Sequence, residues 1–404
     1  MAAFGAVSAD LVAILKELYP TGFPKDVLYA KSPFLAMVAK STDEAYGDTI
    51  KCPILWTDPQ GTSAAFLTAQ TNATGSKYSA FKLDTIDYYG ITQITGRAID
   101  KSKNDRGSFV RGLKSQMDGI MRQVGRRLTH NIFRNSGGAI GVVASISTNT
   151  ITLSNVRDVR YFEVGQVIVM SATDGTSGSV RAGSLTVSAV NRSTGVVTFT
   201  TNVTAGIGAA VAGDYCFIQG DFGLMMSGLD AWIPSSAPGA TAFFGVDRSV
   251  DPTRLGGQRA DLSTLPLDEA VQESLRVVTD EGGTPDVIVL SSNNWMNLAK
   301  LMGSKVVYSE RSDYEGILGF RSLKVMGPSG DVDIIADPDA QSNVMWTLSM
   351  DSWKLYSMGD LVRLLDDDGM PYLRQYNSDG VEIRVVSRPQ LGCSAPGHNG
   401  RFTI

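Results

Sequence analysis

The most regular hydrophobic pattern in the chain lies between residues 105 and 135. Apolar side chains recur there every three or four positions, the spacing that lines one face of an α-helix. They are Phe109, Leu113, Met117, Ile120, Val124, Leu128 and Ile132. The pattern predicts one helix over 109–133, about seven turns and roughly 37 Å long. Gly112, Gly119 and Gly125 fall inside it, and since each costs about 1 kcal/mol relative to alanine, packing must hold this helix.

The polar sides of the predicted helix are strongly basic. They carry Arg106, Arg111, Lys114, Arg122, Arg126, Arg127 and Arg134, against only Asp105 and Asp118. A basic stripe of this kind contacts phosphate, pairs with acidic groups of a neighbouring chain, or is simply a solvated face. The sequence leaves these three interpretations open.

The chain before residue 46 predicts an arm rather than part of a core. A short helix, which Ser8 can cap, is expected first. Its apolar face consists of Leu11, Ile14, Leu15 and Leu18, and Pro20, Gly22 and Pro24 follow it. The next apolar run, 27–39, is broken by Pro33. We expect residues 1–45 to pack either on a neighbouring subunit or on the chain's own domain.

Residues 46–100 are expected to be mainly extended. Apolar residues alternate with other types in two runs, at 50–54 and 81–85, and 91–95 is rich in β-forming residues. Between these runs, 58–79 is rich in Gly, Thr, Ser, Ala and Asn. Two strands joined by so long a polar tip have too little apolar surface to hold themselves. The pattern predicts a loop that is disordered or that a neighbouring subunit orders.

The amino-acid composition of the stretch between residues 141 and 220 differs from that of the chain around it. This stretch has only eight charged residues, no lysine, and many Thr, Ser, Val and Gly. Turn residues separate short β-prone runs. These runs are 150–153, 166–170, 184–190, 195–200 and 215–218. The composition predicts a small antiparallel barrel or sandwich inserted into a host domain.

An α/β unit is expected after a loop at 221–266 that is rich in Gly, Pro and Ser. Helical spacing at 267–278, the apolar run 287–290 and a second helix around Trp295 predict a helix, a buried strand and a helix. Further short strands are expected at 323–326, 332–335, 344–348, 353–356, 362–365 and 381–386. The last residues, 389–404, are expected to form a loose tail.

Composition narrows the class of protein. The chain has 404 residues, of which 43% are hydrophobic and 19% charged, a globular composition long enough for two or three domains. Its net charge of −5 excludes a nucleic-acid coat held on by bulk positive charge. No apolar run is long enough to span a membrane. Cys52, Cys216 and Cys393 lie far apart, which predicts a reduced environment without disulfides or a zinc site.

Candidate catalytic chemistry is sparse. Of the two histidines, His130 is expected at the surface or in an interface. His398 can form a nucleophilic pair with Cys393 only if the tail holds the two side chains within hydrogen-bond reach. The glycine-rich stretch 137–141 follows a helix rather than a strand, so it predicts a hinge and not a phosphate loop. No HExxH, Walker A or GxSxG pattern occurs.

Two acidic clusters also have plain structural interpretations. Asp366, Asp367, Asp368 and Gly369 lack the spacing of a calcium loop, and Asp-Gly between apolar pairs predicts a hairpin turn. The second cluster, Asp331, Asp333, Asp337 and Asp339, alternates with apolar residues in a predicted strand and turn. We therefore expect no catalytic residue, no metal ligand and no cofactor.

The order of these parts resembles the Hong Kong 97-type major capsid proteins of tailed bacteriophages. YAKSPFLAMV at 29–38 is similar to the arm of many members, and GGTPD at 282–286, SSNNW at 291–295 and GILG at 316–319 follow in order. The resemblance covers the whole chain except about 141–220, and its motifs are specific only in combination. It implies an α+β, Hong Kong 97-like capsid fold with an inserted all-β domain.

The resemblance also implies a division of the chain. Its parts are an N-terminal arm (1–45), an extended loop lying across an adjacent subunit (46–100), a spine helix of the peripheral domain (101–140), the inserted β domain (141–220), and the axial domain with the remainder of the peripheral domain (221–404). By the same resemblance the protein is not an enzyme. It would assemble in the host cytoplasm and reside in the virion.

The partners follow from the resemblance as well. Copies of the chain would form hexamers and pentamers of an icosahedral shell around double-stranded DNA, contacted non-specifically, with no membrane partner. Met1 lies only a few residues before the arm, which predicts a separate scaffolding protein. The resemblance also implies a portal protein, and it leaves open whether a decoration protein binds. Lys77 and Lys82 lie in the loop, but nothing identifies a partner asparagine, so crosslinks between subunits are not predicted.

Other classes of protein stay open at this point. An encapsulin-type shell protein shares the fold but packages enzymes, and would need a pocket for cargo peptides. A carbohydrate-binding tail or adhesin protein would expose aromatic platforms, whereas the aromatic residues of 141–220 fall mostly in strand-like runs. They are Tyr161, Phe162, Phe199, Tyr215 and Phe217. A hydrolase would need a nucleophile and a base, which the shortage of histidine disfavours.

Overall fold

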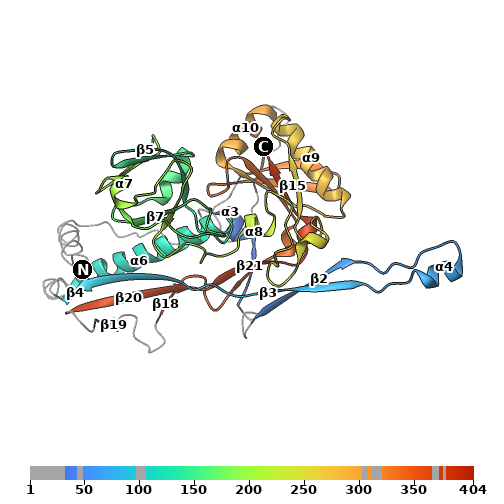
Figure 1. Cartoon of the computed structure of the whole chain (residues 1–404), viewed down its shortest axis with the longest axis horizontal. Coiled ribbons are helices and arrows are strands. Elements are labelled where there is room, and N and C mark those ends of the chain that lie inside the picture. Colours follow the sequence, from blue (N-terminus) through green and yellow to red (C-terminus); the bar gives the residue numbers. More distant parts are fainter. Residues whose placement is uncertain are drawn as a thin grey trace. The chain divides into compact units, whose positions relative to one another are not determined.

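The protein divides into two compact units (Figure 1). The first comprises Met1–His130 and Ile233–Ile404, and the second Asn131–Trp232. The computed structural model describes residues 32–42, 49–96, 106–302, 308–310, 321–365, 373–375 and 379–404. The helix expected after Ser8 and the acidic cluster at 366–369 lie outside the described residues.

A mixed seven-stranded sheet forms the centre of the first unit, in the order β11-β22-β16-β12-β15-β14-β13. Its strands are β11 (Gln258–Asp261), β12 (Val287–Ser291), β13 (Tyr308–Glu310), β14 (Arg321–Gly327), β15 (Gly330–Asp337), β16 (Val344–Leu348) and β22 (Gly400–Thr403). Strand β12 is buried along its whole length. It pairs parallel with β15 and antiparallel with β16, which suits a continuous apolar run.

Two helices pack their apolar faces against this sheet. They are α9 (Leu267–Asp280) and α10 (Ser292–Met302). Val271, Leu275 and Val278 of α9 share one core with Ile288 and Leu290 of β12. The helix, buried strand and helix predicted from the spacing of apolar residues are therefore confirmed.

The last residues form buried strands, so the prediction of a loose tail at 389–404 is wrong. Strand β21 (Pro389–Cys393) is buried throughout. It pairs antiparallel with β17 (Trp353–Ser357), which pairs parallel with β1 (Ala39–Ser41) on its other side. Strand β22 lies inside the large sheet, between β11 and β16. Strands buried on both faces lack the alternation on which strand prediction depends.

One helix, α6 (Arg106–Asn131), runs for 26 residues. It confirms the single long helix of the sequence pattern and ends two residues earlier than predicted. A ladder lies beside it, formed by β4 (Tyr88–Thr95) and β20 (Gly380–Ser387) with the short β18 (Arg363–Leu364) and β19 (Leu373–Arg374). A Cβ atom on Gly90 of β4 would lie 2.7 Å from Val124 Cγ2 and 2.8 Å from Ile120 Cγ1. The glycine therefore permits close approach of strand and helix.

The second unit is built around a closed barrel in the order β10-β5-β6-β9-β8-β7. Its strands are β5 (Gly141–Ser147), β6 (Thr150–Leu153), β7 (Val167–Ser171), β8 (Leu185–Asn191), β9 (Val196–Phe199) and β10 (Tyr215–Ile218). The helical segments η1 (Val156–Tyr161) and α7 (Val203–Gly206) follow β6 and β9. Each β-prone run of the sequence overlaps one of these strands, whereas β5 lies in a stretch for which no strand is predicted.

The remaining helical segments are short. They are α3 (Pro33–Met37), α4 (Phe66–Thr71), α8 (Leu229–Trp232), η2 (Arg248–Val250), η4 (Met350–Ser352) and η5 (Pro396–His398). Two of them, α3 and α4, belong to the assembly surfaces described below.

Two glycine substitutions should separate helix propensity from packing. A Cβ atom on Gly119 of α6 meets nothing within 4 Å, so Gly119→Ala should stabilise the subunit by about 0.5–1 kcal/mol. Gly90→Ala should instead destabilise it by roughly 1–3 kcal/mol, because the new methyl overlaps Val124 and Ile120. Thermal unfolding of the purified subunit measures both. Equal effects would contradict the close contact between β4 and α6.

Candidate assembly surfaces

The strands β2 (Ile50–Thr57) and β3 (Lys77–Leu83) form a separate two-stranded hairpin. They pair antiparallel from Ile50 opposite Leu83 outward. At the base, Cys52, Ile54 and Phe81 are buried on one face. The two alternating strands predicted from the sequence are thus confirmed.

Hydrogen bonds fix the base of the hairpin to the rest of the first unit. At the base, the Lys82 N–H donates to the Phe244 carbonyl at 2.9 Å. Further out, Arg254 Nη1 donates to the Trp56 carbonyl at 3.0 Å. Cys52 Sγ lies 3.4 Å from the Tyr356 hydroxyl of β17. The base is therefore held by both apolar and polar contacts.

The outer half of the hairpin buries little of its own surface. Burial ends after Ile54, and Tyr78 is 70% exposed. Beyond the bridge between Gln60 and Thr74, the tip carries α4, which has no buried residue (Figure 1). Phe66 and Leu67 of α4 are 81% and 76% exposed. The sequence predicted a polar loop here; the structure places two adjacent, exposed apolar side chains on a short helix, which indicates a contact site for another molecule.

A buried carboxyl group anchors α3 to the central sheet. Asp337, at the end of β15, is fully buried. It accepts hydrogen bonds from the Ser32 hydroxyl at 2.7 Å, from the Phe34 N–H at 3.3 Å and from the Asp339 N–H at 2.9 Å. Ser32 is also the N-cap of α3. The carboxyl group thus holds the first turn of the helix against the sheet.

The environment of Asp337 changes its protonation. Burial, together with the charge of Asp339, raises its pKa from 3.8 to about 7, although the three hydrogen bonds it accepts act in the opposite direction. Burial disfavours the ionised form because the protein interior solvates a charge less well than water does. The anchor of α3 therefore carries a carboxyl group that titrates near neutral pH.

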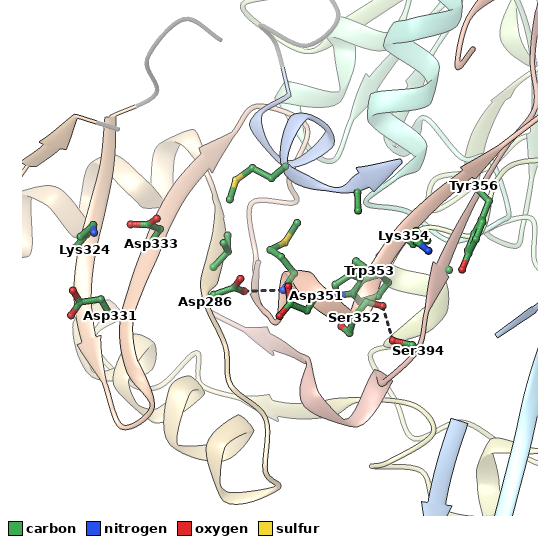
Figure 2. Close-up of a pocket in the computed structure, with 15 residues that line it drawn as sticks. Asp286, Lys324, Asp331, Asp333, Asp351, Ser352, Trp353, Lys354, Tyr356 and Ser394 are labelled. Carbon is green, nitrogen blue, oxygen red and sulfur yellow. Dashed lines mark hydrogen bonds between the residues drawn. The ribbon is translucent and has the colours of Figure 1, made fainter. Parts of the chain in front are cut away.

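A cavity of about 570 Å³ opens between β15 and β17 (Figure 2). Its charged lining residues are Asp286, Lys324, Asp331, Asp333, Asp351 and Lys354. Asp286 Oδ1 accepts a hydrogen bond from the Met350 N–H at 2.8 Å. No histidine or cysteine lines the cavity, and beside its acids and lysines it carries the hydroxyl groups of Ser352, Tyr356 and Ser394. Among the described residues no cluster suited to a metal ion occurs.

The comparison that decides the family concerns residues 114–369, which match the model of the SU10 major capsid protein family. The match covers more than half of the chain. The chain belongs to the SU10 major capsid protein family. It is a major capsid protein of a tailed phage, a structural component of the virion. The encapsulin alternative is not favoured.

Three solved structures are similar to this capsid protein to different degrees. The Cyanophage A-1(L) capsid asymmetric unit matches with a TM-score of 0.53 and 14% identity, over 93% of this chain and 92% of that chain. The capsid of a native GTA particle matches with a TM-score of 0.48 and 10% identity, over 100% and 99% of the two chains. The structure of Mycobacterium phage Ogopogo matches with a TM-score of 0.45 and 11% identity, over 96% of each chain.

At such identities the first likeness shows a shared fold of mixed helices and sheets. A search of curated protein sequences found no significant match. Within the described part of the capsid protein, no helix is both long and apolar enough to cross a membrane.

Cys393 and His398 do not form a nucleophilic pair. Cys393 is fully buried and His398 is exposed, and none of the hydrogen bonds of the described residues joins them. Instead, Asn399 Nδ2 lies 3.8 Å from Cys393 Sγ. Burial raises the pKa of the Cys393 thiol to about 12, which keeps it protonated and unreactive at neutral pH.

The prediction that His130 lies at a surface or interface is wrong for the subunit. His130 is fully buried, and so are its neighbours Arg127 and Leu128. The last turn of α6 is surrounded on all sides, so the polar face of the helix does not continue to its end. A helical spacing pattern shows which face is apolar, but it does not show that the opposite face meets water.

The basic stripe of α6 is not one uniform surface. Arg122 is exposed, Arg126 is half-buried and Arg127 is buried. Arg134, beyond the helix, pairs with Asp158 at 3.7 Å. The side chains of Arg106, Arg111 and Lys114 lie outside the described residues. In the described part of the helix, Arg122 is therefore the residue best exposed for phosphate or a neighbouring chain.

The buried Asp337 should make stability depend on pH. Between about pH 4 and the pKa of about 7, the folded subunit binds a proton that the unfolded chain releases. The stabilising contribution is therefore complete below about pH 4 and is lost as pH rises to about 7, by on the order of 4 kcal/mol. Asp337→Asn should remove this slope. Urea unfolding at pH values from about 5 to 8 measures it.

A second substitution tests the cause of the raised pKa. Asp339→Asn removes the neighbouring charge and should move the slope to lower pH without abolishing it. Identical pH dependence in the wild type and in Asp337→Asn would show that folding does not shift the pKa of this carboxyl group.

Proposed function

We propose that this capsid protein builds its shell by laying the β2–β3 hairpin across a neighbouring copy, in a Hong Kong 97-like layout. The observation that carries the proposal is the pair Phe66 and Leu67, which lie exposed at the end of a hairpin whose base is fixed. An exposed apolar pair on a fixed extension is suited to insertion into another subunit. Repeated head-to-tail contacts of this kind close into rings and shells.

The parts of the chain take the following roles in this proposal. Residues 1–45 are an arm, with α3 as the point where the arm joins the sheet, and 46–100 are the extended loop. Residues 101–140 are the spine of a peripheral domain, 141–220 an inserted β domain, and 221–404 the axial domain with the rest of the peripheral domain. The anchoring of α3 by Asp337 supports the first assignment, because it fixes where the arm leaves the sheet.

The proposed assembly has several partners. Hexamers and pentamers of the chain form an icosahedral shell around double-stranded DNA. Contacts with the DNA are non-specific and electrostatic, for which the exposed Arg122 is suited. A separate scaffolding protein, a portal protein and a decoration protein complete the particle.

The hairpin contact is tested with a double substitution, Phe66→Gln with Leu67→Gln. Both side chains are exposed in the subunit, so its free energy of unfolding should change by no more than about 0.5 kcal/mol. Assembly into shells should be lost or strongly reduced, as judged by electron microscopy and sedimentation after expression with and without a candidate scaffolding protein. Replacing the tip, residues 61–73, by a short Gly-Ser turn should have the same effect.

Met326→Gln is the matched control. Met326 is 85% exposed. The variant therefore loses a similarly exposed apolar side chain away from the hairpin, and it should form shells normally. Normal shells from the double variant would contradict the proposed role of the hairpin. That result would leave the family assignment untouched.

A further inference from the structure

The strands of the barrel fall into two sets with the same pattern of burial. Strands β5 and β8 each have seven residues, with inward and outward positions in the same order along their length. Strands β6 and β9 each have four residues and again share one burial order. The ladder of β5 with β6 is irregular between Val143 and Ser145, and that of β8 with β9 between Val187 and Ala189. The irregularities occupy matching positions.

The helical segments after these strands begin in the same way. The Asn155 side chain caps η1 by accepting from the Arg157 N–H at 3.1 Å. The Asn202 side chain caps α7 by accepting from the Thr204 N–H, also at 3.1 Å. An asparagine thus performs the same capping role at the same place in both sets.

The turns before β7 and β10 also correspond. Gly165 and Gly213 both have positive φ, 86° and 94°. The Gly165 N–H donates to Val187 O, and the Gly213 N–H donates to Val143 O, each at 2.8 Å. Each set of strands therefore donates one backbone hydrogen bond to the other set and accepts the equivalent hydrogen bond from it.

One side-chain contact in these turns is repeated with different residues. Gln166 Oε1 accepts from the Glu163 N–H at 3.0 Å. Asp214 Oδ2 accepts from the Val211 N–H at 2.9 Å. The two turns make equivalent hydrogen bonds although the residue types at matching positions differ. This indicates that both turns have the same backbone arrangement.

The registers of the ladders relate the two sets by an approximate two-fold axis. Tyr215 of β10 lies opposite Val142 of β5, as Val167 of β7 lies opposite Thr186 of β8. Exchanging the sets turns one ladder into the other.

Two further pairs locate the axis. Ile151 of β6 faces Val197 of β9, and Val169 of β7 faces Phe217 of β10. In each pair the two residues hold equivalent positions in the two sets. An approximate two-fold axis must therefore pass between the members of each pair, on two sides of the barrel.

We propose that the barrel is an internal duplication of one β-β-helix-β unit, with 141–171 as the first copy and 185–219 as the second. The face of each unit is self-complementary and fits a second unit of the same kind, as in an isologous dimer. A closed six-stranded barrel does not by itself require matched strand irregularities, matched asparagine caps, matched glycines and reciprocal hydrogen bonds. Duplication accounts for all of them together.

The two copies of the repeat, 141–171 and 185–219, differ most in surface charge. Segment η1 and its flank carry Arg157, Asp158, Arg160 and Glu163, whereas α7 and the residues after it are uncharged as far as Asp214. The equivalences are thus retained in the buried and turn positions, while the exposed positions have diverged. The barrel presents one charged and one uncharged version of the same helical segment.

Exchanging the order of the two units within the full chain tests the duplication. If the units are equivalent, placing 185–219 before 141–171 with short linkers rebuilds the same barrel, because every contact between the units is kept and only the connections change. Amide hydrogen exchange of the purified chain should show protection of the barrel strands within about tenfold of the wild type. A control with the natural order and the same linkers should be protected as well. Loss of protection in the exchanged chain but not in this control overturns the proposal.

A second exchange distinguishes equivalent units from general tolerance. Moving the cuts into the middle of β6 and β9 divides both units and should abolish protection of the barrel. If this variant is protected as well as the first, unit boundaries have no special meaning and the proposal fails.

The matched glycines provide an independent measurement. Gly165→Ala and Gly213→Ala should lower the midpoint temperature for unfolding of the barrel equally. Both glycines have similar positive φ and open space around the Cβ position. Clearly unequal shifts would mean that the two turns are not equivalent, which would count against duplication.

Discussion

A two-stranded ribbon cannot bury both of its own faces, and the organisation of the first unit depends on this constraint. The hairpin of β2 and β3 solves it only at the base, where Cys52 and Phe81 meet the rest of the unit. There Tyr356 of β17 and the backbone of Phe244 receive it. Outside that zone a ribbon has no second layer to pack on. Either the outer half stays solvated, or another chain supplies the missing layer, and the exposed apolar side chains at its tip favour the second solution.

The base of the hairpin keeps its position during such a contact only if the strands on which it packs are held in place. Buried polar groups hold these strands. Asn399 is fully buried, and its carbonyl oxygen accepts from the Ser349 N–H at 2.9 Å and from Trp353 Nε1 at 2.8 Å. Its amide donates to the Ala395 carbonyl at 2.8 Å. One side chain thus links the end of the chain to β16 and β17. A satisfied buried amide of this kind restricts alternative packings, because any shift would leave it unpaired.

Several features were predicted from the sequence because their apolar residues recur at a regular period. The long helix, the helix-strand-helix of the first unit and the inward face of β2 each have an apolar spacing that only one structure suits. The buried final strands and the anchor at Asp337 were not predicted, since neither leaves such a period. Asp337 was identified only as one acid of a strand and turn, and its contact with Ser32 joins residues 305 positions apart. A contact between such distant residues depends on the whole topology, and local pattern carries no record of it.

The barrel shows a different limit of sequence reasoning. Its two halves share hydrogen bonds and strand irregularities but few residues: Gln166 and Asp214 accept equivalent bonds with different side chains. Repeats are recognised in sequence by identity at a fixed spacing, and both are missing here, because the two halves differ in loop length. What the halves retain is the backbone constraint at Gly165 and Gly213, where positive φ favours glycine. A fold that two diverged halves can still build is tolerant of change at its surface. That tolerance suits a module carried within a capsid subunit, because its exposed residues can vary without disturbing the strands that hold it together.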